Sequence, residues 1–171
     1  MNKTIGIFGG GQLGRMMAQA ALPLNLQCTF FEAETNCPAA ILGSVFSSKN
    51  EQGLQDFIAS ADVFSLEFEN TPVADVDVLT QTKTLHPPRL ALATAQNRLA
   101  EKALFDQLAI PVAPYRAVDS LESLKQAVAE LGLPIVLKTV TGGYDGKGQF
   151  VLRSEDQIDT AWAELGPATS L

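Results

Sequence analysis

The sequence is poor in the features that mark disulfide-stabilised, membrane and nucleic-acid-binding proteins. Its two cysteines, Cys28 and Cys37, form no C-x-x-C pair, so we expect free thiols. Twelve basic residues stand against nineteen acidic ones, and the formal net charge of −7 predicts no general attraction to nucleic acid or an anionic membrane. The N-terminal segment lacks an apolar run long enough for a signal peptide or membrane span, which favours a cytoplasmic location. Any phosphate site must therefore be built locally.

An apolar content of 46% in 171 residues predicts a globular chain with one ordinary domain or two small ones. In the first half, short apolar runs typical of strands alternate with segments of helical periodicity. The predicted strands are Thr4–Phe8, Leu26–Phe31, Val63–Glu67 and a short one within Lys83–His86. The predicted helices are 12–22, with Leu13, Met16, Met17 and Ala20 on one stripe, 51–60, with Leu54, Phe57 and Ile58, and a segment opening at Pro72. This alternation predicts an α/β fold with a Rossmann-like parallel sheet.

The pattern changes after Pro87-Pro88, which we interpret as the seam between two domains, residues 1–95 and residues 96–171. A long amphipathic helix is predicted over 94–108, with Leu99, Ala103 and Leu104 facing inward. Two more helices carry capping signals: Asp119 with Glu122 at the start and Gly132 at the end of one, and Ser154 with Gln157 at the start of the other. Strands at 135–139 and 149–153 complete the pattern. An antiparallel pair with so few helices is too little for an independent core, so we interpret the second domain as an incomplete α+β region.

The first of two glycine clusters follows the strand at Thr4–Phe8. Gly9, Gly11 and Gly14 match G-x-G-x-x-G between a strand and a helix, where bare backbone N–H groups and the positive helix end approach an anion. Glu32 and Glu34, about 20 residues further on, stand where an acid that binds the ribose of NAD would stand. The simpler alternative is that these glycines only permit tight packing between strand and helix.

The second cluster, TGGYDGKGQ at 141–149, follows an apolar strand that ends in Lys138. Its glycines would let amide N–H groups wrap a polyphosphate, with the Lys138 ammonium held behind them. The spacing is not that of a P-loop, because no G-x-x-x-x-G-K-[ST] is present and no Ser or Thr follows Lys147. A glycine-rich hairpin of this kind suits a lid over ATP. A lysine that merely extends its stem along the strand end is the alternative for Lys138.

The motifs GGGQLGRM, SLEFEN, QNRLAEK, LPIVLK and TGGYDGKGQ resemble the ATP-grasp enzymes, and within them the 5-(carboxyamino)imidazole ribonucleotide synthases of purine biosynthesis. The resemblance covers essentially the whole chain, and Tyr144-Asp145 distinguishes this family from related ligases. It implies that residues 1–95 are a pre-ATP-grasp domain that binds aminoimidazole ribonucleotide rather than NAD, and that residues 96–171 begin an ATP-grasp domain. The implied reaction has two stages. ATP phosphorylates bicarbonate to carboxyphosphate, and the ribonucleotide amine then takes up the carboxyl group.

The resemblance also implies roles for individual residues. Glu67 would accept hydrogen bonds from the ribose, and Asp145 would orient or deprotonate the amine as the catalytic base. The remaining ribonucleotide contacts would come from Gly10, Gly11, Gln12, Leu13, Tyr144 and Lys147. The ATP contacts would come from Arg98, Lys138, Gly142, Gly143, Gly146, Lys147 and Gly148. The alternatives are a solvated strand end for Glu67, a solvated helix face for Arg98 and an Asx turn for Tyr144-Asp145.

The resemblance also implies that part of the catalytic machinery lies outside this sequence. The family's acidic residues and asparagine that hold magnesium, and the basic residues for bicarbonate and the ribonucleotide phosphate, are not present, so we expect no metal ligand here and no activity from this chain alone. A homodimer is a candidate assembly for the full-length protein. Two other hypotheses stay open: an NAD-binding oxidoreductase domain and a non-catalytic nucleotide-binding module.

Overall fold

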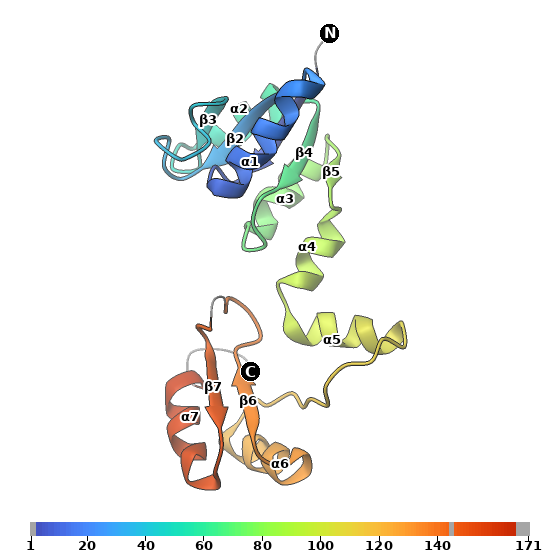
Figure 1. Cartoon of the computed structure of the whole chain (residues 1–171), viewed down its shortest axis with the longest axis vertical. Helices are drawn as coiled ribbons and strands as arrows, with labels where there is room; N and C mark the ends of the chain where they lie inside the picture. Colours follow the sequence, from blue (N-terminus) through green and yellow to red (C-terminus); the bar gives the residue numbers. More distant parts are fainter. Residues whose placement is uncertain (1–2, 144–145, 167–171) are drawn as a thin grey trace. The chain divides into compact units, whose positions relative to one another are not determined.

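The computed structural model describes residues 3–143 and 146–166 of the chain (Figure 1). The chain divides into two compact units, Met1–Ala93 and Thr94–Leu171. The division falls a few residues beyond Pro87-Pro88, because helix α4 (Arg89–Ala95) begins immediately after the two prolines and buries Leu92 in the first unit.

The first unit is built on a five-stranded sheet in the order β3-β2-β1-β4-β5, with all four pairings parallel. The predicted Rossmann-like parallel sheet is therefore confirmed. The chain begins in the middle, winds outward to β3, and then crosses back to β4 and β5, so the winding direction reverses between β1 and β4. Ligands of open α/β sheets bind at the carboxyl ends of the strands beside such a reversal. The strands are β1 (Thr4–Phe8), β2 (Gln27–Glu32), β3 (Ser44–Ser47), β4 (Val63–Leu66) and β5 (Leu85–His86).

Helices cover both faces of this sheet (Figure 1). Successive strand residues point to opposite faces, so Ile7 and Phe8 of β1 enter different cores. Phe8 packs against Phe57 with the ring centroids 5.1 Å apart, on the side covered by α2 (Gly53–Ser60), α3 (Val73–Thr80) and α4. Ile7 joins the core under α1 (Gln12–Ala21), which continues into the short 3₁₀ helix η1 (Leu22–Leu24).

Helix α1 packs on the sheet through small residues rather than through the predicted stripe. Gly14, Ala18 and Ala21 are buried, whereas Leu13 and Met16 are 55% and 60% exposed. A Cβ atom on Gly14 would lie 2.9 Å from the backbone oxygen of Gly9, so the helix comes too close to the glycine loop for a larger side chain. The predicted stripe is wrong for Leu13, Met16 and Ala20, which are exposed, because this close approach selects small residues for the inner face; Met17 is partly buried against the core.

Other elements also differ from the predictions. Strand β3 has no counterpart among the predicted strands, because its four residues lie at the sheet edge and are too few to show a clear pattern. The helix predicted over 94–108 is broken: the Asn97 side chain accepts hydrogen bonds from the N–H groups of Leu99 and Ala100 and starts a new helix, α5 (Arg98–Gln107). Within α5, which is fully described, no residue is buried, so Leu99, Ala103 and Leu104 do not enter a core as predicted.

The second unit has an antiparallel strand pair, β6 (Ile135–Lys138) and β7 (Gln149–Leu152), with α6 (Leu121–Leu131) and α7 (Ile158–Leu165) packed on one face. The predicted α+β character is confirmed. Gly132 ends α6 at a φ of 75°, as predicted, but the N-cap is Ser120 rather than Asp119, because Ser120 and Ser123 form a reciprocal capping box. Ser154 makes no capping hydrogen bond before the 3₁₀ helix η2 (Glu155–Gln157); the Gln157 side chain instead accepts from the Arg153 N–H.

Candidate functional site

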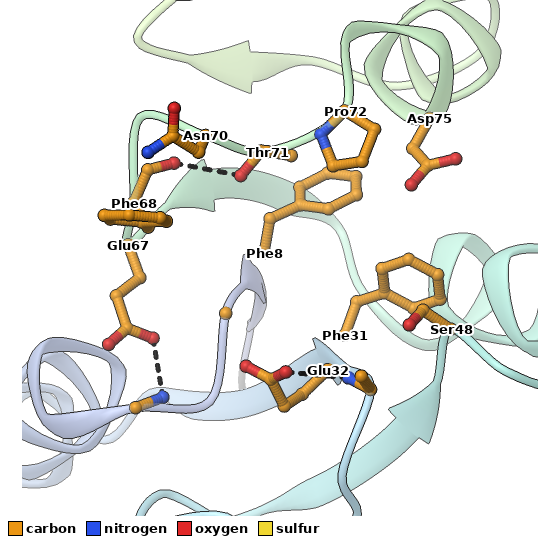
Figure 2. Close-up of a pocket in the computed structure, with 13 residues that line it drawn as sticks. Phe8, Phe31, Glu32, Ser48, Glu67, Phe68, Asn70, Thr71, Pro72 and Asp75 are labelled. Carbon is orange, nitrogen blue, oxygen red and sulfur yellow. Dashed lines mark hydrogen bonds between the residues drawn. The ribbon is translucent and has the colours of Figure 1, made fainter. Parts of the chain in front are cut away.

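The first glycine cluster surrounds a carboxylate that belongs to the protein itself. Glu67, one residue beyond β4, accepts a hydrogen bond from the N–H group of Gly11 at 2.7 Å (Figure 2) and another from that of Leu13 at 3.1 Å. Cβ atoms on Gly9, Gly11 and Gly14 would lie 2.6, 2.5 and 2.8 Å from the Glu67 carboxylate oxygens. The glycines are therefore needed so that Glu67 can reach the start of α1, which has no acidic residue in its own first turn.

A second carboxylate occupies the neighbouring N–H group. Glu32, the last residue of β2, accepts from the N–H of Gly10 at 3.1 Å and from that of Ala33 at 2.7 Å. The backbone donors that bind pyrophosphate in a dinucleotide-binding loop are thus already paired with carboxylates. Glu34, the other acid considered for a ribose, forms an exposed ion pair with Lys49. This arrangement argues against NAD as the ligand of the loop.

A cavity of about 310 Å³ opens at the carboxyl ends of β1, β2 and β4, beside the reversal in strand order. Figure 2 shows its aromatic wall, Phe8, Phe31 and Phe68, together with the carboxylates of Glu32 and Glu67. Among the described residues that line it, none is lysine, arginine or histidine. Such a cavity favours a ligand that donates hydrogen bonds over one that brings negative charge. Its lining residues are Phe8, Gly9, Gly11, Phe31, Glu32, Ala33, Ser48, Glu67, Phe68, Asn70, Thr71, Pro72 and Asp75.

The residues predicted for the ribonucleotide lie differently around this cavity. Gly11 and Glu67 line it. Gly10 is buried against Cys37 and Glu32, while the side chains of Gln12 and Leu13 are exposed outside the lining. Asp75, in the first turn of α3, lines the cavity although sequence reasoning missed it; burial raises the pKa of its carboxyl group above the usual 3.8.

The glycine loop of the second unit has a crowded base and an open rim. The N–H of Thr139 donates to the Gly148 oxygen at 2.9 Å and closes the base. Cβ atoms on Gly143 and Gly148 would lie 2.8 Å from the Lys147 oxygen and 2.7 Å from the Thr139 hydroxyl. On Gly142 a Cβ would meet nothing within 4 Å, but its φ is 77°. Gly146 has a φ of 80° and is similarly open. The predicted residues Tyr144 and Asp145 lie outside the described residues.

Arg98 approaches this loop from the first position of α5. Its Nη1 donates to the Thr139 oxygen at 3.1 Å, its Nη2 donates to the Gly143 oxygen at 3.0 Å, and its backbone N–H donates to the Val140 oxygen at 2.9 Å. Lys138 is exposed at the end of β6. Beyond it, Thr139 is 8% exposed, and among the described residues its hydroxyl has no hydrogen-bond partner.

Arg98, Lys138 and Thr139 also line a cavity of about 520 Å³ in the second unit. Apolar side chains from α5, α6 and β6 form much of its wall, so basic and apolar groups meet in one space. That combination suits a nucleotide, whose base is apolar on its faces and whose phosphates are anionic. The lining residues are Arg98, Leu99, Lys102, Ala113, Pro114, Tyr115, Arg116, Val118, Leu124, Ala127, Leu131, Pro134, Ile135, Val136, Leu137, Lys138, Thr139 and Val140.

The described residues hold no group of three or more His, Cys, Asp or Glu side chains placed to bind a metal ion. None of the helices in the described part of the chain is long and apolar enough to cross a membrane.

Two family profiles match the chain in sequence order. The ribonucleotide synthetase preATP-grasp domain matches residues 1–96, and the ATP-grasp domain matches residues 103–170. The chain belongs to the ribonucleotide synthetase preATP-grasp family. The resemblance to the carboxyaminoimidazole ribonucleotide synthases, noted from the motifs, is confirmed by individual relatives: the chain corresponds to the N-terminal part of these ATP-grasp proteins.

Among these relatives, the N5-carboxyaminoimidazole ribonucleotide synthase of Pseudomonas aeruginosa is 40% identical over 164 residues, which are 95% of this chain and 46% of that protein. A solved N5-carboxyaminoimidazole ribonucleotide synthetase in complex with ADP is 42% identical, with a TM-score of 0.90 over 98% of this chain and 45% of its own. The Aspergillus clavatus enzyme, solved with ADP and 5-aminoimidazole ribonucleotide, is 27% identical with a TM-score of 0.87, over 99% of this chain and 45% of its own. The chain thus spans about half the length of these relatives.

Proposed function

We propose that this chain is the N-terminal part of an ATP-dependent carboxylating ligase. The ligase converts 5-aminoimidazole ribonucleotide, bicarbonate and ATP to 5-carboxyaminoimidazole ribonucleotide, ADP and phosphate. The observation that carries the proposal is the meeting of Arg98, Lys138 and the glycine loop beside one cavity, in a chain whose relatives include a synthetase solved with ADP.

In the proposed ATP site, the Lys138 ammonium and the Arg98 guanidinium provide the positive charge for the phosphates. The loop glycines Gly142, Gly143, Gly146 and Gly148, with Lys147, provide close backbone approach. Cations and N–H groups fixed before the substrate arrives stabilise the charge that moves during phosphoryl transfer, because they need no reorganisation. The apolar wall of the same cavity receives the base. We propose residues 96–171 as the beginning of the ATP-grasp domain.

In the proposed ribonucleotide site, in residues 1–95, the ligand places its donor groups against the carboxylates of Glu67 and Glu32. The ribose hydroxyls and the exocyclic amine of aminoimidazole ribonucleotide are such donors, and Phe8 and Phe31 offer an apolar surface for the ring. The ribonucleotide phosphate lies away from the glycine cluster, because its N–H groups already donate to Glu67 and Glu32. Gly10, Gly11, Gln12 and Leu13 shape this end of the site through their main chain.

For the second stage of the reaction we propose Asp145 as the base that accepts a proton from the amine as it attacks the carboxyl carbon of carboxyphosphate; the bond from this carbon to the phosphate oxygen breaks, and inorganic phosphate leaves. Tyr144 and Lys147 contact the same ligand. These roles follow from the resemblance of the TGGYDGKGQ motif, and the magnesium of the reaction would be held by residues beyond those described here. We therefore propose that the 171-residue chain binds nucleotide without turning it over.

Amide chemical shifts of the 171-residue chain, recorded during titration with millimolar ADP, test the ATP site. We expect shifts in residues 138–143 and 146–148, and at least a tenfold weaker response in Lys138→Met, because one phosphate contact is lost. Lys125→Met, an exposed lysine on α6, is the matched control and should respond like the unmodified chain. An ADP response that is equal in Lys138→Met and the unmodified chain would contradict the proposed site. Saturable binding of NAD would instead favour the oxidoreductase hypothesis.

A further inference from the structure

The side chain of Arg98 donates hydrogen bonds to the glycine loop of its own unit. Its two terminal nitrogens donate to two different carbonyls, that of Thr139 at 3.1 Å and that of Gly143 at 3.0 Å. The backbone N–H of the same residue donates to Val140. One residue thus fixes three successive points of the main chain that leads from β6 into the loop.

The loop base that Arg98 holds is tightly packed. Gly143 and Gly148 lie so close to Thr139 that Cβ atoms on them would approach its hydroxyl to 3.2 and 2.7 Å. The same hydroxyl is buried and has no hydrogen-bond partner among the described residues. Its burial costs desolvation free energy and therefore does not stabilise this packing. Something else must hold the base together. Two sets of contacts do so: the bond between the Thr139 N–H and the Gly148 oxygen, and the bonds that the Arg98 guanidinium donates.

We propose that Arg98 is a positioning residue that fixes the base of the glycine loop through Thr139 and Gly143. Any effect of Arg98 on phosphate binding rests on the proposed function, whereas its effect on the loop base does not depend on a ligand. The two carbonyls accept from separate nitrogens of the planar guanidinium group. The role therefore depends on the shape of this group and not only on its positive charge. A lysine ammonium at this position keeps the charge but cannot reproduce both bonds.

Hydrogen exchange in the ligand-free 171-residue chain tests this role. The Thr139 amide reports on the loop base, because it donates to Gly148. We expect Arg98→Met to accelerate its exchange about tenfold or more, the effect of losing charge-assisted bonds to two carbonyls. Arg98→Lys should resemble Arg98→Met. The control Arg153→Met, at an exposed arginine of the same unit, should leave the rate unchanged.

Unchanged exchange in Arg98→Met, or a wild-type rate in Arg98→Lys, would overturn the proposal. The Leu124 amide in α6 monitors global opening, since a variant that merely loosens the whole unit would accelerate both amides equally. A second measurement needs no variant: in the unmodified chain, the two Nη groups of Arg98 should give separate, slowly exchanging nitrogen resonances, unlike those of Arg153. Averaged resonances for Arg98 would refute its two side-chain hydrogen bonds even if every variant failed to fold.

The same experiments separate this inference from the proposed function. If Arg98 variants disturb the loop base but ADP never binds the chain, the positioning role stands and the ATP site fails. If ADP binds and Lys138→Met weakens it while Arg98→Met leaves Thr139 exchange unchanged, the ATP site stands and the positioning role fails.

Discussion

Replacing Glu67 with alanine should destabilise the first unit and create an anion site where the protein now has none. In the native unit the carboxylate accepts from Gly11 and Leu13 at the start of α1. Alanine leaves both N–H groups without this partner and removes the negative charge from the positive end of the helix. The glycines around the carboxylate would then face an empty space.

The size of the effect can be worked out from these two bonds. Hydrogen bonds to charged groups contribute about 1.5–3 kcal/mol, and replacing a capping side chain with alanine costs about 0.5–2 kcal/mol. The Gly11 bond, at 2.7 Å, lies at the strong end, whereas the Leu13 bond, at 3.1 Å, is longer and more exposed. We therefore expect a loss of about 2 kcal/mol for Glu67→Ala, or about 2 M in the urea midpoint if the unit's m-value is about 1 kcal/mol/M.

The chain carries its own reference for this assay. Its only tryptophan, Trp162, and both tyrosines, Tyr115 and Tyr144, lie in the second unit, so aromatic fluorescence follows residues 94–171 alone. Hydrogen exchange of β1 amides in urea follows the first unit. Glu34→Ala is the control, since its exposed ion pair with Lys49 contributes less than about 1 kcal/mol.

A loss below about 0.5 kcal/mol in Glu67→Ala would refute the assignment of Glu67 as the cap of α1. The first unit of the variant should also gain stability from added inorganic phosphate, which binds only the folded state, whereas the first unit of the unmodified chain should not. Equal stabilisation of the first unit in both proteins would show that the glycine cluster accepts an anion despite its carboxylates.

Two further predictions concern other residues. Gly148→Ala should weaken the ADP response at the loop more than Gly142→Ala. The Cβ of the first variant would lie 2.7 Å from the Thr139 hydroxyl, whereas Gly142 has open space and is limited only by its φ of 77°. Equal effects of the two variants in the ADP titration would contradict the crowded loop base. Asp75→Asn should stabilise the first unit at pH 7 and not at pH 3, because burial raises the pKa of Asp75 and its native form becomes less stable as pH rises through that pKa. Urea unfolding curves at the two pH values measure the difference in unfolding free energy between the variant and the unmodified chain. The same difference at pH 3 and pH 7 would refute the prediction.

The parallel sheet could be predicted because its strands are apolar runs separated by helical segments, and such alternation has few structural solutions. The start of α5 could not be predicted from periodicity, since the Asn97 side chain interrupts a pattern that otherwise runs on from Thr94. The inner face of α1 was misassigned for a similar reason. A hydrophobic pattern reports which residues are apolar, but not how closely two elements approach.

The two glycine clusters show the same limit at the candidate sites. From the sequence, the G-x-G-x-x-G spacing predicts a strand, a loop and a helix, and all three are present. The spacing does not reveal which anion lies at the helix start, because Glu67 lies 56 residues from Gly11 along the chain. The contact between Arg98 and Gly143, 45 residues apart, was equally invisible to a local pattern.

Helix α1 reverses the usual relation between side-chain size and tolerance of substitution. Two of its bulky members, Leu13 and Met16, are exposed, and we expect that polar residues can replace them at little cost to packing. Its smallest members, Gly14, Ala18 and Ala21, set the distance between helix and sheet, so even one added methyl group at Gly14 would push the helix away from the carboxylate that caps it. In this helix we therefore expect Gly14, Ala18 and Ala21 to tolerate less enlargement than the exposed positions do.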